Sequence, residues 1–282
     1  MKKILVPYDF SEYANHALDF ACQIAASTGG HITLFHVIEN PFGQGINTQG
    51  EVTGEDPEIK LYFVKLLEKT EQWLADAIAN DKYKTTEIRR RIEIGTPYKG
   101  IGKNIAEWNA DLIVMGTKGT SNLEEFFVGS NTEKVVRFSK CPVIAVPATG
   151  SLRSVSNIAF ATNFESGQSR VIKKLSEYQK LFGAKLHLLW INTIHDTENQ
   201  DMTLNQLENF AKEHGLENYS THVSRAVTTE EGILRFVAEN NMDMIAMGTH
   251  GYQGLSHLFL GSIAEDVVNH AEKPVWTFNM RP

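Results

Sequence analysis

Cysteine is scarce in this sequence of 282 residues, which contains only Cys22 and Cys141. The two residues lie far apart, with no C-x-x-C pair and no Cys/His spacing of the kind that holds zinc. The sequence therefore predicts a reduced protein of the cytoplasm, with no cysteine-based metal site. Cys141 precedes Pro142, and we interpret it as a small buried thiol just before a strand.

Long apolar runs are also missing. No stretch approaches the roughly 18 consecutive apolar residues that a membrane-spanning helix needs. The apolar run in MKKILVPYDF at the start is too short for the core of a secretory signal. We therefore expect a soluble intracellular protein with no membrane partner.

Concentrated positive charge is the third absence. The chain has 27 Lys and Arg against 34 Asp and Glu, a formal net charge of −7. A nucleic-acid partner would require a clustered Lys/Arg surface that displaces counterions. The only tight basic run, Arg89 to Arg91, reads better as the solvated edge of a strand. We expect no nucleic-acid partner.

The sequence does contain an internal repeat. Residues 111–146 align without a gap with residues 243–278, and segments 2–12 and 31–40 match segments 156–166 and 185–194. The first copy is longer because of a Gly- and Pro-containing stretch, residues 41–57, which we interpret as a surface loop. The repeat predicts two domains, residues 1–148 and 155–282, joined by a linker at 149–154.

Each copy alternates short β-rich runs with longer amphipathic segments, the pattern of a parallel sheet covered by crossover helices. The fold class is therefore α/β, with two tandem open five-stranded parallel sheets and helices on both faces. In the first copy, Gly29-Gly30 ends the first helix. The strands expected there are Ile4–Val6, Ile32–Ile38, Arg89–Ile94, Leu112–Met115 and Val143–Val146. The later helices are expected near Glu58–Asn80, Lys99–Asn109 and Asn131–Ser139.

A glycine-rich turn follows the fourth strand of each copy. After Met115 come Gly116, two residues, Gly119, nine residues, and then Gly129-Ser130 before a helix. The second copy keeps this spacing with Gly248, Gly251, Gly261 and Ser262. Glycine lets the backbone approach a ligand closely, and the free N–H groups at a helix N-terminus favour a phosphate.

The alternative is that these glycines only allow a tight turn, but the identical spacing in both copies favours a ligand site. The turn is not a Walker A loop, because no G-x-x-x-x-G-K-[ST] occurs. No G-x-G-x-x-G follows the first strand either, so the usual dinucleotide fingerprint is absent.

The spacing G-x2-G-x9-G-[ST], met by both copies, resembles the nucleotide-binding signature of the universal stress protein family in its tandem two-domain form. The resemblance implies a Rossmann-like, adenine nucleotide α-hydrolase-like fold that binds ATP or a related adenine nucleotide. It also implies that Asp9, preceded by Pro7, holds the adenosine together with Val37. The loop that surrounds the phosphates would comprise Met115, Gly116, Lys118, Gly119, Gly129, Ser130, Asn131 and Thr132.

The second copy departs from this pattern. Asn163 stands in place of Asp9, Ala161 in place of Pro7, and Ala264 in place of Thr132. The positions that keep the pattern are Ile191, Met247, Gly248, His250, Gly251, Gly261, Ser262 and Ile263. If the lost carboxylate and the lost hydroxyl each weaken binding by about 1 kcal/mol, the N-terminal site is about 30-fold stronger.

The function expected is binding of an adenine nucleotide in a stress response, as a regulator rather than a catalyst. No set of catalytic residues can be assembled from spacing, so hydrolysis would be weak, and any Mg²⁺ would be carried by the phosphates. Two alternatives stay open. One is an enzyme of the same fold that adenylylates a substrate, and the other is an interaction module that no longer binds nucleotide.

The last strand of each copy, Val143–Val146 and Val275–Phe278, is an apolar run whose open edge needs a partner. Members of the resembling family commonly associate through these strands, so we expect an antiparallel pairing of the two within one chain. The sequence leaves open whether two such chains then form a homodimer. Three histidines on the second strands, His31, His36 and His187, are interpreted as core or edge residues.

Overall fold

The protein is described by a computed structural model. The residues that the structure describes are 2–39, 57–119, 129–148, 154–164, 168–194, 199–249 and 263–280. Most of the expected loop at 41–57 and of the linker at 149–154 lies outside these ranges. Within the described residues, no helix has the length and apolar character that crossing a membrane requires.

The N-terminal half alternates strands and helices as the sequence predicts. Its strands are β1 (Lys3–Pro7), β2 (His31–Glu39), β3 (Glu87–Gly95), β4 (Leu112–Gly116) and β5 (Val143–Val146). Its helices are α1 (Glu12–Thr28), α2 (Pro57–Ala77), the 3-10 turn η1 (Asp81–Tyr83), α3 (Pro97–Trp108) and α4 (Ser130–Phe138). Gly29 ends α1 in the left-handed conformation, at φ 63°, as expected of a glycine C-cap.

The C-terminal half repeats this order. Its strands are β6 (Asn157–Ala161), β7 (Lys185–Asn192), β8 (Tyr219–Arg225), β9 (Met244–Thr249) and β10 (Val275–Asn279). Its helices are α5 (Gln168–Phe182), α6 (Gln200–Glu213), α7 (Thr229–Glu239) and α8 (Ile263–His270).

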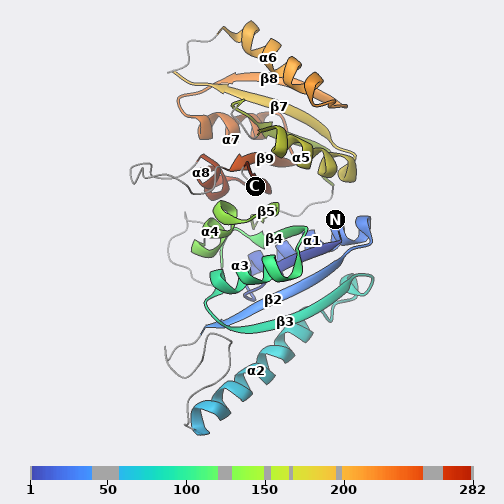
Figure 1. Cartoon of the computed structure of the whole chain (residues 1–282), viewed down its shortest axis with the longest axis vertical. Helices are drawn as coiled ribbons and strands as arrows, with labels where there is room; N and C mark the ends of the chain where they lie inside the picture. Colours follow the sequence, from blue (N-terminus) through green and yellow to red (C-terminus); the bar gives the residue numbers. More distant parts are fainter. Residues whose placement is uncertain are drawn as a thin grey trace.

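The ten strands form one sheet in the order β3-β2-β1-β4-β5-β10-β9-β6-β7-β8 (Figure 1). Within each half every strand pairs parallel to its neighbours. The strand order reverses between β1 and β4 in the first half and between β6 and β9 in the second. Ligands of open α/β sheets bind at the carboxyl ends of the strands at such a reversal. The predicted fold class is confirmed.

Alternating residues of each strand face two separate cores. In β1, Ile4 and Val6 belong to the core on the face covered by α1, and Leu5 belongs to the core on the other face, which includes residues of α3 and α4. All five residues of β4 are buried, as expected for a central parallel strand. At the opposite extreme, β3 is an edge strand, and its exposed Arg89 and Arg90 pair with Glu87 and Glu71. The interpretation of this basic run as a solvated strand edge is therefore correct.

The two cysteines differ in burial. Cys22 on α1 is buried, and this burial raises the pKa of its thiol to about 11. Cys141, expected to be buried, is only partly so, and Ser139 Oγ donates to its carbonyl oxygen and accepts from its backbone N–H.

The two halves join through their last strands. β5 and β10 pair antiparallel, with Ala145 opposite Val275 and Val143 opposite Thr277. Trp276 at the centre of this seam is fully buried. The expected intrachain pairing is thus present, and each strand covers the edge that the other would leave open.

A histidine pair lies on one face of the C-terminal sheet. His187 Nδ1 lies 3.2 Å from His222 Nε2, and Ser220 Oγ lies within 3.1 Å of both nitrogens. His187 Nε2 lies 3.1 Å from Asn157 Oδ1. The interpretation of His187 as a satisfied core residue is confirmed. Burial, with the nearby His222 and Lys185 charges, lowers its pKa to about 4, and burial also lowers the pKa of His222.

This pair should make the free energy of unfolding depend on pH. In the folded protein the pKa of each ring is lower than the value of about 6.5 that it has once unfolded, so the unfolded state binds more protons at acid pH. Stability should therefore fall by about 1–2 kcal/mol between pH 7 and pH 4.5. Urea unfolding across this range measures the slope. In the variant His187→Gln the free energy of unfolding should depend less on pH. An unchanged slope in that variant would exclude the histidine pair as the source of the pH dependence.

Candidate functional site

The residues singled out in the first copy surround one cavity at the carboxyl ends of β1, β2 and β4. The cavity has a volume of about 300 Å³. Its lining includes all eleven site residues expected in the first copy, namely Pro7, Asp9, Val37, Met115, Gly116, Lys118, Gly119, Gly129, Ser130, Asn131 and Thr132. Residues separated by more than 100 positions are thus brought together at the point where the strand order reverses.

Asp9 is fixed at the end of β1 by a local turn. Its Oδ1 accepts a hydrogen bond of 3.1 Å from the backbone N–H of Ser11, the N-cap residue of α1. Between them Phe10 has φ 66°, a left-handed conformation that is unusual for a bulky residue. The equivalent residue of the second copy, Phe164, has φ 58°. Such strain persists where the surrounding structure imposes it, and here it directs the residue at position 9 or 163 into the cavity.

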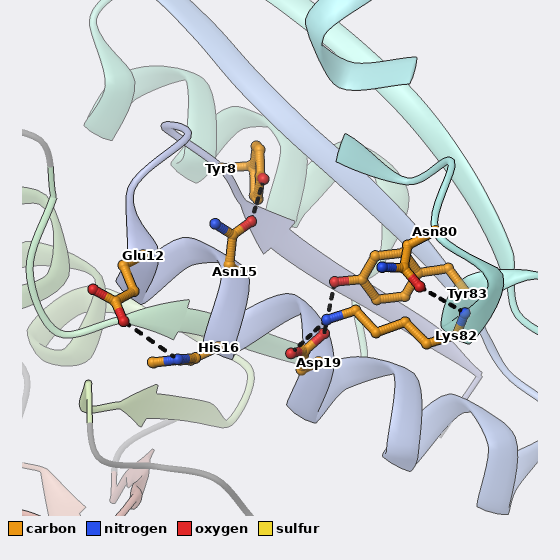
Figure 2. A network of polar contacts seen from close by, with 8 residues as sticks. All are labelled: Tyr8, Glu12, Asn15, His16, Asp19, Asn80, Lys82 and Tyr83. Atoms are coloured by element: carbon orange, nitrogen blue, oxygen red, sulfur yellow. Dashed lines mark hydrogen bonds and ion pairs between the residues drawn. The ribbon is translucent and has the colours of Figure 1, made fainter. Parts of the chain in front are cut away.

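The start of α1 supports the same turn. Figure 2 shows Tyr8 directed toward Asn15 of α1, with its hydroxyl donating to Asn15 Oδ1 at 2.5 Å. Further along α1, Asp19 accepts from the hydroxyl of Tyr83 at 2.6 Å and pairs with Lys82, which ties the helix to η1 (Figure 2). The helix that follows Asp9 is therefore held at two points in its first half, Asn15 and Asp19.

His36 is a site residue that the sequence analysis missed. It was interpreted as a core or edge residue, but it lines the cavity beside Val37. Its Nδ1 donates to the carbonyl oxygen of Tyr8 at 2.7 Å, so the ring connects β2 to the strand end that carries Asp9. Burial lowers the pKa of His36, and the ring is therefore neutral at pH 7. Its place next to Val37 at the end of a strand was the signal available in the sequence.

The phosphate side of the predicted site is built around the start of α4. Gly129 is the N-cap residue, and no side chain caps the helix there. The first N–H groups of a helix lack intrahelical partners and favour an anion. Thr132 does not contribute its hydroxyl proton to this end, because Oγ1 donates to the carbonyl of Gly116 at 2.9 Å. Thr132 thus fastens α4 to the end of β4.

The glycines of the turn differ in the space that a side chain would have at each position. A Cβ at Gly116 would lie 2.6 Å from Tyr13 Cβ and 2.8 Å from the Tyr13 carbonyl carbon. A Cβ at Gly119 would lie 2.5 Å from Asp9 Oδ2, so glycine there leaves room for the carboxylate. At Gly129, with φ −58°, a Cβ would meet nothing closer than 3.8 Å. The fold itself therefore requires glycine at 116 but not at 129.

This contrast predicts opposite effects on stability. Gly116→Ala should destabilise the protein by about 2 kcal/mol or more, because the backbone of α1 would have to move. Gly129→Ala should change the free energy of unfolding by less than about 0.5 kcal/mol. Urea denaturation of the two variants measures both changes in the free energy of unfolding. An equally large loss in both variants would show that the turn needs both glycines for folding.

The second copy has a cavity of its own at the equivalent place, with a volume of about 440 Å³. It is lined by Ile191, Met247, Gly248 and Ile263 of the predicted set, together with Ala161, Asn163 and Ala264. The other predicted residues, His250, Gly251, Gly261 and Ser262, lie outside the described residues.

The glycine spacing and the sheet topology can be compared with known proteins. A model of the universal stress protein family matches residues 1–147 and again residues 155–279. This chain belongs to the universal stress protein family. The two matches correspond to the two halves of the sheet.

Relatives of this family align over one or both halves. Universal stress protein Slr1230 from Synechocystis sp. is 23% identical, over 99% of this chain and all of that protein. Universal stress protein MJ0577 from Methanocaldococcus jannaschii is 30% identical, over 53% of this chain and 97% of its own. The crystal structure of a universal stress protein from Archaeoglobus fulgidus covers 99% of this chain and 98% of its own, with a TM-score of 0.77 at 22% identity. These likenesses establish a tandem member of the family and its fold.

Proposed function

We propose that this universal stress protein binds ATP, or a related adenine nucleotide, in the N-terminal cavity and acts as a stress-response regulator through the bound state. The observation that carries the proposal is the convergence of all eleven signature residues of the first copy on one cavity. The proposed domains are residues 1–148 and 155–282, with the linker at 149–154, and each contains one of the two equivalent cavities.

Two features of the N-terminal cavity fit a nucleotide. Asp9 offers a carboxylate that can accept hydrogen bonds from the adenosine, on a turn that Ser11 and Phe10 hold in place. The uncapped start of α4 and the ammonium group of Lys118 are both favourable for phosphates. The cavity therefore combines a hydrogen-bond acceptor with an anion-binding helix start.

The protein supplies binding and orientation, and turnover should be slow. Among the described residues no cluster of three or more His, Cys, Asp or Glu side chains could hold a metal ion. A Mg²⁺ ion that accompanies the triphosphate would be held mainly by its phosphates.

The N-terminal site should be the stronger of the two for ATP. A charge-assisted hydrogen bond to Asp9 contributes about 1 kcal/mol more than a neutral bond to Asn163. The hydroxyl of Thr132 already donates to the carbonyl of Gly116. The difference in ATP affinity therefore rests mainly on the Asp9 carboxylate and on Lys118, which is His250 in the second copy. We expect the ATP affinities of the two sites to differ at least about tenfold.

Identifying the small molecules released when the purified protein is denatured tests the proposal. Adenine nucleotide released at close to one equivalent per chain is the expected result. An adenylylated intermediate or a second substrate would instead indicate an enzyme of the same fold. Protein that releases no nucleotide and binds no added ATP would indicate an interaction module.

A further inference from the structure

The cavity of the C-terminal domain differs from the first in charge. In the first copy, Asp9, Glu39 and Lys118 are charged lining residues. Asn163 and Thr193 take the places of Asp9 and Glu39, and no described residue that lines the second cavity is an Asp, Glu, Lys or Arg. The sequence of the second glycine turn, residues 248–262, contains none of these four residue types either.

The second cavity is also more apolar. Trp190 replaces His36, Ile263 replaces Asn131, and Met280 joins the lining from beyond the end of β10. Trp190 stacks on Phe164, with ring centroids 5.0 Å apart and an interplanar angle of 16°. Transferring a triphosphate into such surroundings leaves its charge poorly compensated, which is unfavourable. An uncharged ring compound loses far less hydration there.

Three residues of this lining carry buried polar atoms that have no hydrogen-bond partner in the described part of the chain. These atoms are Gln168 Oε1, Trp190 Nε1 and Thr249 Oγ1. Gln168 is 4% exposed and Thr249 is 5% exposed. Gln168 stands where the first copy has Ala14, and its amide donates to Asn163 Oδ1 at 3.2 Å. Buried polar groups are normally satisfied, so these atoms point to a ligand with both donors and acceptors.

We propose that the C-terminal cavity selects an uncharged ligand of the nucleoside class, whereas the N-terminal cavity takes the charged nucleotide. This inference deepens the proposed function, on which it rests, by assigning the two domains different ligands. The described lining residues supply one acceptor, one donor and one hydroxyl to a neutral heterocycle, and none of them supplies a countercharge to a phosphate chain. The protein would then report on the ratio of nucleotide to nucleoside rather than on ATP alone.

Calorimetric titration of adenosine and of ATP into the full-length chain with both Gly129→Val and Asp9→Asn tests this inference, because the two substitutions affect the phosphate contacts and the adenosine contact of the N-terminal site. We expect adenosine to bind one site per chain, at least about tenfold more tightly than ATP binds the same site. ATP that binds there as tightly as adenosine, or adenosine that does not bind, overturns the inference. Failure of the proposed function is seen separately, as loss of ATP binding by the unaltered chain.

Two variants locate the adenosine site. Thr249→Val removes an unsatisfied buried hydroxyl at nearly constant shape, so the fold should be as stable as before, while adenosine affinity should fall about fivefold. Gln168→Ala introduces the residue that the first copy has at this position, and it should lower adenosine affinity by a similar factor. Neither variant should alter the affinity of the N-terminal site for ATP. Unchanged adenosine affinity in both variants, with normal unfolding midpoints, would contradict the assigned cavity.

Discussion

Replacing Gly129 with valine should abolish ATP binding in the N-terminal cavity while the protein stays folded. A Cβ at this position meets only backbone atoms of residues 117–119, at 3.8 Å or more, and φ is −58°, which any residue adopts. The fold therefore accepts the valine, but its methyl groups would enter the space in front of the uncapped start of α4. We expect a loss of affinity on the order of 100-fold or more, equivalent to about 3 kcal/mol.

The matched control is Gly261→Val, at the same place in the second repeat of the sequence. That variant should leave the dominant ATP site unchanged. Calorimetric titration with ATP gives the affinities, and urea unfolding verifies that each variant is folded. Unchanged ATP affinity in a folded Gly129→Val protein would mean that the turn serves the fold alone.

Removing Arg137 should destabilise the junction between the two domains. Arg137 of α4 forms two hydrogen bonds with Glu265 of α8, from Nε to Oε1 at 2.5 Å and from the terminal guanidinium to Oε2 at 2.6 Å. The Glu265 side chain is only 6% exposed, so Arg137→Met leaves a buried carboxylate without this charge partner. Removal of one member of a buried pair typically costs several kcal/mol, and we expect about 2–4 kcal/mol here because Arg137 is partly exposed.

The double variant Arg137→Met, Glu265→Leu should recover most of this loss, because it removes the buried charge as well. Lys84→Met is the exposed control: its pair with Asp81 has side chains 70% and 87% exposed. That control should change the free energy of unfolding by less than about 0.5 kcal/mol. Urea denaturation measures all three variants. A loss below 1 kcal/mol in Arg137→Met would show that this ion pair contributes little to the junction.

The pair also has a structural consequence for the two cavities. α4 and α8 each begin at a glycine turn, and the Arg137–Glu265 contact joins the helices across the domain boundary. Pseudosymmetry would place Glu133 opposite Asn269, which cannot form the same ion pair. The junction is therefore asymmetric, as are the cavities on either side of it.

Sequence patterns predicted the repeated α/β order, the ten strands and the antiparallel seam. These features depend on local periodicity and on apolar edges that must be covered, and both can be read along the chain. The bounds moved slightly where propensity is weak: the helix expected to reach Asn80 ends at Ala77, and β3 extends over Glu87–Gly95. The resemblance to universal stress proteins also implied which residues of the first copy would gather around one cavity.

The hydrogen-bond and ion-pair partners of individual side chains could not be predicted in the same way. The bond from Thr132 to Gly116, the ring of His36 against the Tyr8 carbonyl and the Arg137–Glu265 pair each join residues between 16 and 128 positions apart. They depend on how strands and helices pack, which the spacing of a motif does not encode. For the same reason the unsatisfied acceptor of Gln168 in the second cavity could not be predicted from the sequence.

The central claim is that Asp9 makes the N-terminal cavity the dominant ATP site. Calorimetric titration of ATP into the unaltered chain and into Asp9→Asn tests it most directly. We predict one dominant site per chain, weakened about tenfold in Asp9→Asn because a neutral oxygen replaces the carboxylate. Two equal sites, or a dominant site that survives Asp9→Asn but is lost in Gly251→Val with Gly261→Val, would contradict the claim.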